Sequence, residues 1–229
     1  MTRTTNARLA GFSFLLYIAL GIPTLILFGK ATGGEGVAAK LASIAQHVTD
    51  VRLSTLFTVL TSFCALALAV TLWAITRDQD SDLAMLALTC RVGEGLSGGI
   101  GLNRSLGLLW LATTSGARAP DPASVNGLGA FLLWGQGGGI SAIFFALGST
   151  IFSWLMLRGR MIPAALAWLG VISSALLVVA LPLDLVDFLP GGIVNYLWIP
   201  MAAFEIPLAV WFLVRGVAAP ARTRPALVS

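Results

Sequence analysis

The feature that most constrains this chain is the segment from Leu83 to Leu111, which is apolar enough to cross a lipid bilayer but carries Arg91 and Glu94 near its middle. The interior of a bilayer has no water to solvate such charges, so ionisable side chains there pair with one another or line a cavity. A series of glycines accompanies them: Gly93, Gly95, Gly98, Gly99 and Gly101. We therefore expect the other helices to be arranged around this segment.

The composition indicates a membrane protein. Of the 229 residues, 57% are hydrophobic and only 10% are charged, whereas a soluble domain carries about 25% charged residues. The net charge of +4 does not indicate nucleic-acid binding, because the basic residues lie at the ends of apolar runs and form no patch interleaved with aromatic side chains. The sequence predicts an all-α, multi-pass protein whose main partner is the lipid bilayer.

Six apolar runs have the length expected of transmembrane helices. They cover approximately residues 9–28, 53–75, 83–111, 128–157, 162–183 and 193–214, and we assign them to a single membrane domain, 1–229. The first run is about 20 residues long, whereas the apolar core of a signal peptide is about 7–15, so we interpret it as an uncleaved helix. The end of the chain, 216–229, is rich in proline and arginine and is predicted to be disordered.

Six crossings place both termini on one side of the membrane. Basic residues are more numerous on that side, which carries Arg3, Arg8, Arg77, Arg158, Arg160, Arg215, Arg222 and Arg224, than on the other, which carries Lys30, Lys40, Arg52 and Arg118. Since cytoplasmic loops carry an excess of lysine and arginine, both termini are predicted to be cytoplasmic.

The first outer loop contains a helical pattern of its own. Apolar residues recur there at helical spacing, namely Val37, Leu41, Ile44, Ala45 and Val48. This predicts a short amphipathic helix lying on the membrane surface. A lid over a cavity is the alternative interpretation.

No metal centre and no cofactor are predicted. Cys64 and Cys90 are isolated within apolar runs, and His47 has no histidine or cysteine neighbour at ligand spacing. Asp78, Asp80 and Asp82 are close in sequence, but a solvated loop that supplies the N-cap of the third span explains them better than a metal site.

The charged residues within the spans predict a buried cluster. Arg91 and Glu94 are three residues apart and share one helix face. Glu205 lies at a similar depth in the sixth span, and a lone carboxylate there would cost about 2.5–3.5 kcal/mol. We therefore expect Arg91, Glu94 and Glu205 to come together, and we expect one of the two acids to hold a proton. An ion pair that only joins helices is the alternative.

Further residues are candidates for the same site. Pro200 and Pro207 flank Glu205, and each proline frees a backbone carbonyl four residues earlier, which could help to form a proton or cation site. Gln136 lies in a second glycine-rich stretch, and Arg104 and Asp184 are a candidate pair near the outer surface.

The glycines also fit a structural interpretation. Gly95 to Gly99 and Gly135 to Gly139 both follow the G-x-x-x-G pattern, which allows helix backbones to approach closely. Packing of the third span on the fourth would explain these glycines without a ligand. The same faces make a second copy of the chain a candidate partner.

The order of these motifs resembles the bacterial membrane proteins grouped as domain of unknown function 4386. The resemblance rests on Arg8 to Gly11 in the first span, the Arg91-x-x-Glu94 pair, and a later set formed by Gly148, Arg158 to Pro163, Gly170, Pro200, Glu205, Trp211 and Gly216. It implies a six-helix protein of the bacterial inner (cytoplasmic) membrane and implies no mechanism. The glycine density after Glu94 is higher here than expected of the family.

Three functions are consistent with the sequence. The first is a small-solute or proton-linked transporter, or a ligand-binding membrane protein, in which the buried cluster is the site. The second is an intramembrane enzyme that uses two acids to modify a lipid, which is less favoured because no histidine, serine or cysteine arrangement supports it. The third is a structural or accessory subunit in which the cluster only holds helices together.

Overall fold

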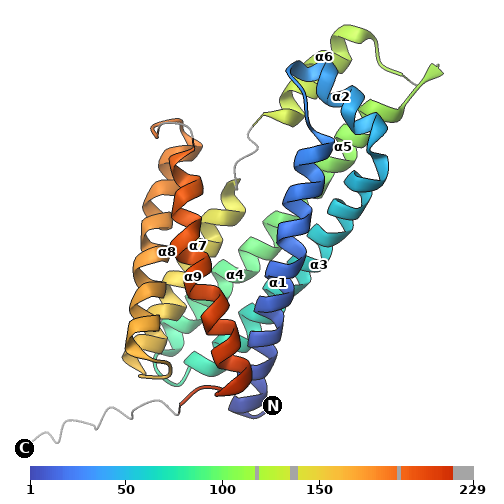
Figure 1. Ribbon diagram of the computed structural model, residues 1–229. Coiled ribbons are helices and arrows are strands. Elements are labelled where there is room, and N and C mark those ends of the chain that lie inside the picture. Colours follow the sequence, from blue (N-terminus) through green and yellow to red (C-terminus); the bar gives the residue numbers. More distant parts are fainter. Residues whose placement is uncertain (117–118, 135–138, 190–191, 219–229) are drawn as a thin grey trace, which may run out of the picture.

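The computed structural model describes residues 1–116, 119–134, 139–189 and 192–218, and within these residues it contains helices and no strand (Figure 1). The helices are α1 (Arg3–Ala31), α2 (Gly36–Gln46), α3 (Val48–Thr76), α4 (Ser81–Ile100), α5 (Leu102–Thr113), α6 (Pro122–Leu133), α7 (Gly139–Arg158), α8 (Ala164–Leu185) and α9 (Ile193–Val214). The all-α prediction is confirmed.

Five of the described helices, α1, α3, α7, α8 and α9, are long and apolar enough to cross a bilayer. The multi-pass prediction is therefore supported, and α9 has the predicted bounds. Helix α4 falls short of this group because its two interior charges and its glycines lower its hydropathy. A sixth crossing therefore stays a prediction.

Two of the expected spans are each divided into two helices. The range 83–111 consists of α4 and α5, which meet at Gly101, so its prediction as one helix is wrong. The range 128–157 is also not one helix, because α6 ends at Leu133 and α7 begins at Gly139. Gly139 has a φ of +54°, a left-handed conformation that glycine adopts without steric cost.

The predicted amphipathic segment is helical, as α2. Its apolar side chains Leu41 and Ile44 are buried in a small cluster with Leu108 and Leu111 of α5 and Val51 of α3. Helix α2 also packs against α6, at the end of the molecule opposite the N-terminus (Figure 1). Its position relative to the membrane surface stays a prediction.

Six of the described helices form a closed ring around the main core. Contacts run from α1 to α3, then to α4, α7, α8 and α9, and from α9 back to α1. The core within the ring is rich in phenylalanine, including Phe14, Phe145, Phe152 and Phe204. Helix α4, which carries the interior charges, thus lies between α3 and α7 and is part of the ring.

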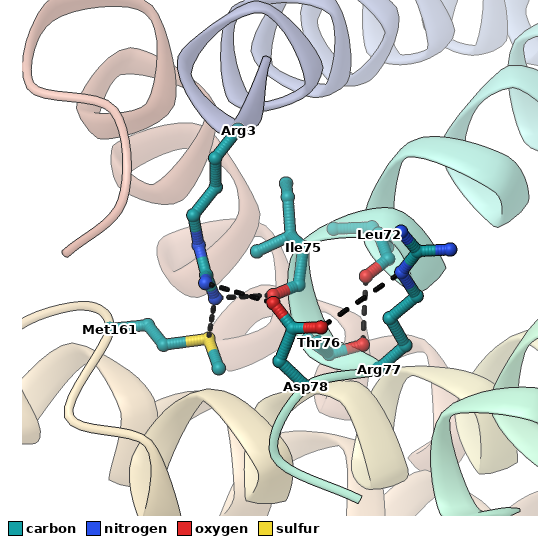
Figure 2. A network of polar contacts seen from close by, with 7 residues as sticks. All are labelled: Arg3, Leu72, Ile75, Thr76, Arg77, Asp78 and Met161. Carbon is teal, nitrogen blue, oxygen red and sulfur yellow. Dashed lines mark hydrogen bonds and ion pairs between the residues drawn. The ribbon is translucent and has the colours of Figure 1, made fainter. Parts of the chain in front are cut away.

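A polar network holds the N-terminal residues at one end of the ring. The guanidinium of Arg3 donates to the carbonyl of Ile75 at 2.5 Å and lies 3.5 Å from the carboxylate of Asp78 and 3.5 Å from the sulfur of Met161 (Figure 2). Ile75 belongs to the last turn of α3, where carbonyls lack partners within the helix and a positive charge is favourable. The network therefore fixes the N-terminus against α3 and the α7–α8 turn.

The segment after α9 lies at the same end. The backbone nitrogen of Ala218 donates to the carbonyl of Met161 at 3.1 Å. Both described ends of the chain are thus on one side, and their cytoplasmic location stays a prediction. Of the predicted disordered tail, residues 216–218 are described, and 219–229 lie outside the described residues.

The acidic residues between α3 and α4 act at the helix ends. Asp80 is the N-cap of α4, where its carboxylate accepts a hydrogen bond from the backbone nitrogen of Leu83 at 3.1 Å. The same carboxylate pairs with Arg158 at 3.7 Å. The interpretation of Asp80 as an N-cap is confirmed.

Closure of the ring between α1 and α9 depends on Gly11. A methyl group added at Gly11 would lie 2.6 Å from the carbonyl oxygen of Ala209, whereas one at Gly21 on the same helix would meet nothing within 4 Å. We expect Gly11→Ala to lower the free energy of unfolding by about 1–3 kcal/mol, because backbone cannot move aside cheaply. Gly21→Ala is the matched control and should be neutral or slightly stabilising. Denaturant titration in detergent measures both, and equal stabilities would contradict the close approach.

Candidate functional site

The centre of the candidate site is an ion pair within α4. Arg91 Nη1 donates to Glu94 Oε2 at 2.7 Å, and the two side chains are 1% and 3% exposed. The two residues are three positions apart, which places them on one face of the helix. The pair is therefore local in sequence but buried by the other helices.

Two aromatic rings and one glycine surround the side chain of Arg91. The guanidinium carbon of Arg91 lies 4.8 Å from the ring centre of Phe145 and 5.7 Å from that of Phe14, in the range of cation–π attraction. On α7, a methyl group added at Gly148 would lie 3.1 Å from Cγ of Arg91. The absence of a side chain at Gly148 thus allows the arginine stem to pack against the α7 backbone.

The carboxylate of Glu94 has a second partner that sequence reasoning missed. The hydroxyl of Tyr17, on α1, donates to Glu94 Oε1 at 2.9 Å. Ser141, on α7, donates to the backbone carbonyl of Glu94 at 3.0 Å. The available signal was that Tyr17 is one of only two tyrosines and lies within a span, away from the interface where tyrosine is usual.

Glu205 lies close to the ion pair without joining it. It is buried in α9 at 7% exposure and is near enough to Arg91 and Glu94 to interact with both electrostatically. Its Oε1 is buried and has no hydrogen-bond partner among the described residues, and neither has Arg91 Nε. The structure thus places the three predicted charges in one buried region as a bonded pair with a separate third carboxyl group.

A cavity of about 170 Å³ opens beside the pair. It is bounded by α1, α3, α4 and α7 through Tyr17, Thr58, Thr61, Ser62, Ala65, Glu94, Gly95, Gly98 and Ser141. Five of these residues carry hydroxyl groups, and Glu94 is the ionisable acid among them. Arg91 and Glu205 do not line this cavity.

The other predicted site residues lie elsewhere. Pro200 and Pro207 are within α9 and do not line the cavity, and Pro207 is exposed. Gln136 lies outside the described residues. The proline-linked carbonyl site therefore stays a prediction.

The candidate outer pair is on two helices that do not touch. Arg104 Nε donates to the carbonyl of Leu132, which belongs to the last turn of α6, so its charge stabilises that helix end. Helix α5 contacts α2, α3, α4 and α6, while α8, which carries Asp184, contacts α7 and α9. An interaction between Arg104 and Asp184 stays a prediction.

The glycines of α4 serve two different purposes. A methyl group at Gly93 would lie 3.2 Å from the ring of Phe144 on α7, so Gly93 provides the close approach to α7. One at Gly95 would meet the backbone of Ser62 on α3 at 3.2 Å instead, and one at Gly99 would meet nothing within 4 Å. The predicted packing on α7 is therefore present, but it does not depend on the Gly95–Gly99 pattern, while Gly135 lies outside the described residues.

Comparison with known families accounts for nearly the whole chain. The family model described as domain of unknown function (DUF4386) matches residues 9–216. This protein belongs to the DUF4386 family. The DUF4386 match covers the helix ring from residue 9 onwards and includes Gly11, Gly148 and Glu205. No curated protein and no solved structure matches the chain.

The contact between Tyr17 and Glu94 can be tested with the two tyrosines of the chain. Tyr17→Phe removes a hydrogen bond to a buried charged group, and such bonds contribute about 1.5–3 kcal/mol. Tyr196→Phe is the matched control, because Tyr196 is 72% exposed. We expect Tyr17→Phe to lower the thermal midpoint in detergent and Tyr196→Phe to leave it unchanged. Equal midpoints for the two variants would contradict the assigned bond.

Proposed function

We propose that this protein binds a small ligand within the membrane, in the cavity beside Glu94, and couples its passage to a proton. The observation that carries the proposal is the cavity of about 170 Å³ lined by five hydroxyl side chains and a carboxylate, adjoining a buried ion pair. A purely architectural ion pair needs partners but no accessible space. Groups that combine convergent polar side chains with open volume are typical of ligand sites.

The charge balance of the region supports the coupling to a proton. Arg91 contributes one positive charge, and Glu94 and Glu205 contribute two negative charges if both are ionised. The excess negative charge is unfavourable in the membrane interior, so it is neutralised either by a proton on one acid or by a cation bound nearby. Glu94 accepts hydrogen bonds from Arg91 and Tyr17, whereas Glu205 Oε1 has no hydrogen-bond partner among the described residues. Glu205 is therefore the acid that can gain or lose a proton without disturbing the ion pair.

The membrane placement that goes with this function is also part of the proposal. We infer that α4 and α5 together make a sixth crossing, with both termini in the cytoplasm and the protein in a bacterial inner membrane. Basic residues near the N-terminus support this orientation. Arg3 and Arg77 both lie beside Asp78 (Figure 2), and Arg158 pairs with Asp80, two residues further along the chain. The cavity would then lie within the hydrocarbon layer.

Proton movement through purified protein tests the proposal. The three glutamates of the chain are Glu35, Glu94 and Glu205, and Glu35 is an exposed loop residue. Liposomes that contain wild-type protein or Glu35→Gln should dissipate an imposed pH gradient, reported by a trapped pH-sensitive dye. Glu205→Gln should slow this at least about tenfold, because the amide cannot carry a proton.

The architectural alternative gives a different result. In that case wild-type protein behaves like empty liposomes, and Glu205→Gln changes only the thermal midpoint. The midpoint of each variant is therefore measured in the same preparation. A wild-type rate equal to that of empty liposomes, or a Glu205→Gln rate equal to wild type, would overturn the role of Glu205.

A further inference from the structure

Among the described residues that line the cavity, every hydroxyl hydrogen is already donated to an acceptor within the protein. Thr58 donates to the carbonyl of Ser54 at 2.9 Å, Thr61 to that of Phe57 at 2.8 Å, and Ser62 to that of Thr58 at 3.1 Å. Ser141 and Tyr17 donate to the backbone carbonyl and the carboxylate of Glu94. A hydroxyl that has given its hydrogen still has lone pairs, so each of these oxygens faces a ligand as an acceptor.

The other described lining residues add acceptors and no donor. The Glu94 carboxylate accepts one bond at each oxygen, from Arg91 and from Tyr17, and a carboxylate has about four lone-pair positions. The backbone of Ala65, Gly95 and Gly98 lies within helices, where the N–H groups are bound to carbonyls one turn earlier. Arg91, which donates to Glu94, is outside the lining, and its guanidinium lies against the rings of Phe14 and Phe145.

We propose that this cavity binds a small monovalent cation, and that a primary ammonium compound is the ligand that fits it best. This inference rests on the proposed function and specifies its ligand. An ammonium group has three donors and no acceptor, which complements a lining of acceptors. A carboxylate or phosphate ligand is disfavoured, because it would place acceptor against acceptor next to Glu94.

The size of the cavity agrees with an organic cation. Its volume of about 170 Å³ is far larger than the roughly 10–15 Å³ that a single water requires. The ring of Tyr17 and the methyl group of Ala65 provide apolar wall beside the acceptors. An alkali-metal ion shares the positive charge and also prefers oxygen ligands, so the test separates the two ions.

The electrostatics of the region also favour a cation. The bonded pair of Arg91 and Glu94 has no net charge, and Glu205 adds a negative charge within electrostatic range of both when it is ionised. A cation in the cavity would neutralise that excess. Tyr17 is the other titratable side chain that interacts electrostatically with Arg91, Glu94 and Glu205.

Gly98 allows the site to be blocked with one methyl group. A methyl group there would lie 3.3 Å from Ser62 Oγ and 3.8 Å from Ser141 Oγ, between two of the acceptors. At the adjacent Gly99 it would meet nothing within 4 Å. Gly98→Ala and Gly99→Ala are therefore chemically identical changes on one helix, and only the first enters the cavity.

Binding is measured as a ligand-dependent rise of the thermal midpoint of the full chain in detergent. The probes are methylammonium chloride and sodium chloride, and tetramethylammonium chloride, which has no N–H donor, keeps the ionic strength constant. We expect methylammonium to raise the midpoint in a saturable way in wild type and Gly99→Ala. Gly98→Ala should weaken binding at least about tenfold, as should Thr61→Val, which removes an acceptor without changing the shape. Thr24→Val is the control for the latter, because Thr24 makes the same type of bond to Leu20 outside the cavity.

The outcomes separate this inference from the proposed function. A saturable response to methylammonium or to sodium that Gly98→Ala weakens supports a cation site, and the more effective ion identifies the ligand type. No saturable response to either ion, or an equal response in Gly98→Ala and Gly99→Ala, overturns the cation site. Proton flux that depends on Glu205, measured in liposomes made from the same purified protein, would then leave the proposed function standing with a different ligand.

Discussion

The ion pair between Arg91 and Glu94 is the interaction on which the rest of this structure depends. Removing two charges from water is costly, and a buried pair compensates for that cost only with good geometry and further favourable contacts. Here the compensation comes from separate helices: Tyr17 and Phe14 from α1, and Phe145 and Gly148 from α7. Helix α4 can therefore carry charges at this depth only when the ring of helices closes around it.

Glycines make that closure possible, because helices in a bilayer gain little from the hydrophobic effect when they associate and depend on close packing instead. Gly11 brings α1 against the backbone of α9, and Gly148 accepts the stem of Arg91. Gly170, on α8, packs against the ring of Phe204, which precedes Glu205 in the sequence. A methyl group added at Gly170 would lie 2.5 Å from that ring. At Gly11 and Gly170 a methyl group would lie closer than 3.0 Å to a neighbouring atom, and at Gly148 it would lie 3.1 Å from Arg91. All three glycines lie within the family match.

Sequence reasoning could predict the membrane class, most helix positions and the pairing of Arg91 with Glu94, because each depends on spacing along a single segment. The breaks at Gly101 and before Gly139 were missed, since glycine is common in transmembrane helices and apolar length alone does not show where a helix ends. The contribution of Tyr17 could not be predicted for a different reason. It depends on which face of α1 meets α4, and that is set by the packing of the whole ring.

The positions of the two acids suggest how a ligand and a proton would influence each other. Glu94 lines the cavity but is held by two donors, whereas Glu205 is outside the cavity and its Oε1 is unbonded among the described residues. A cation bound near Glu94 would offset the same excess negative charge that a proton on Glu205 removes. The two events would then oppose each other, and by thermodynamic linkage each would weaken the other by the same factor. Opposition of this kind is the property that allows a site to exchange a cation for a proton, and it requires no contact between the two carboxyl groups.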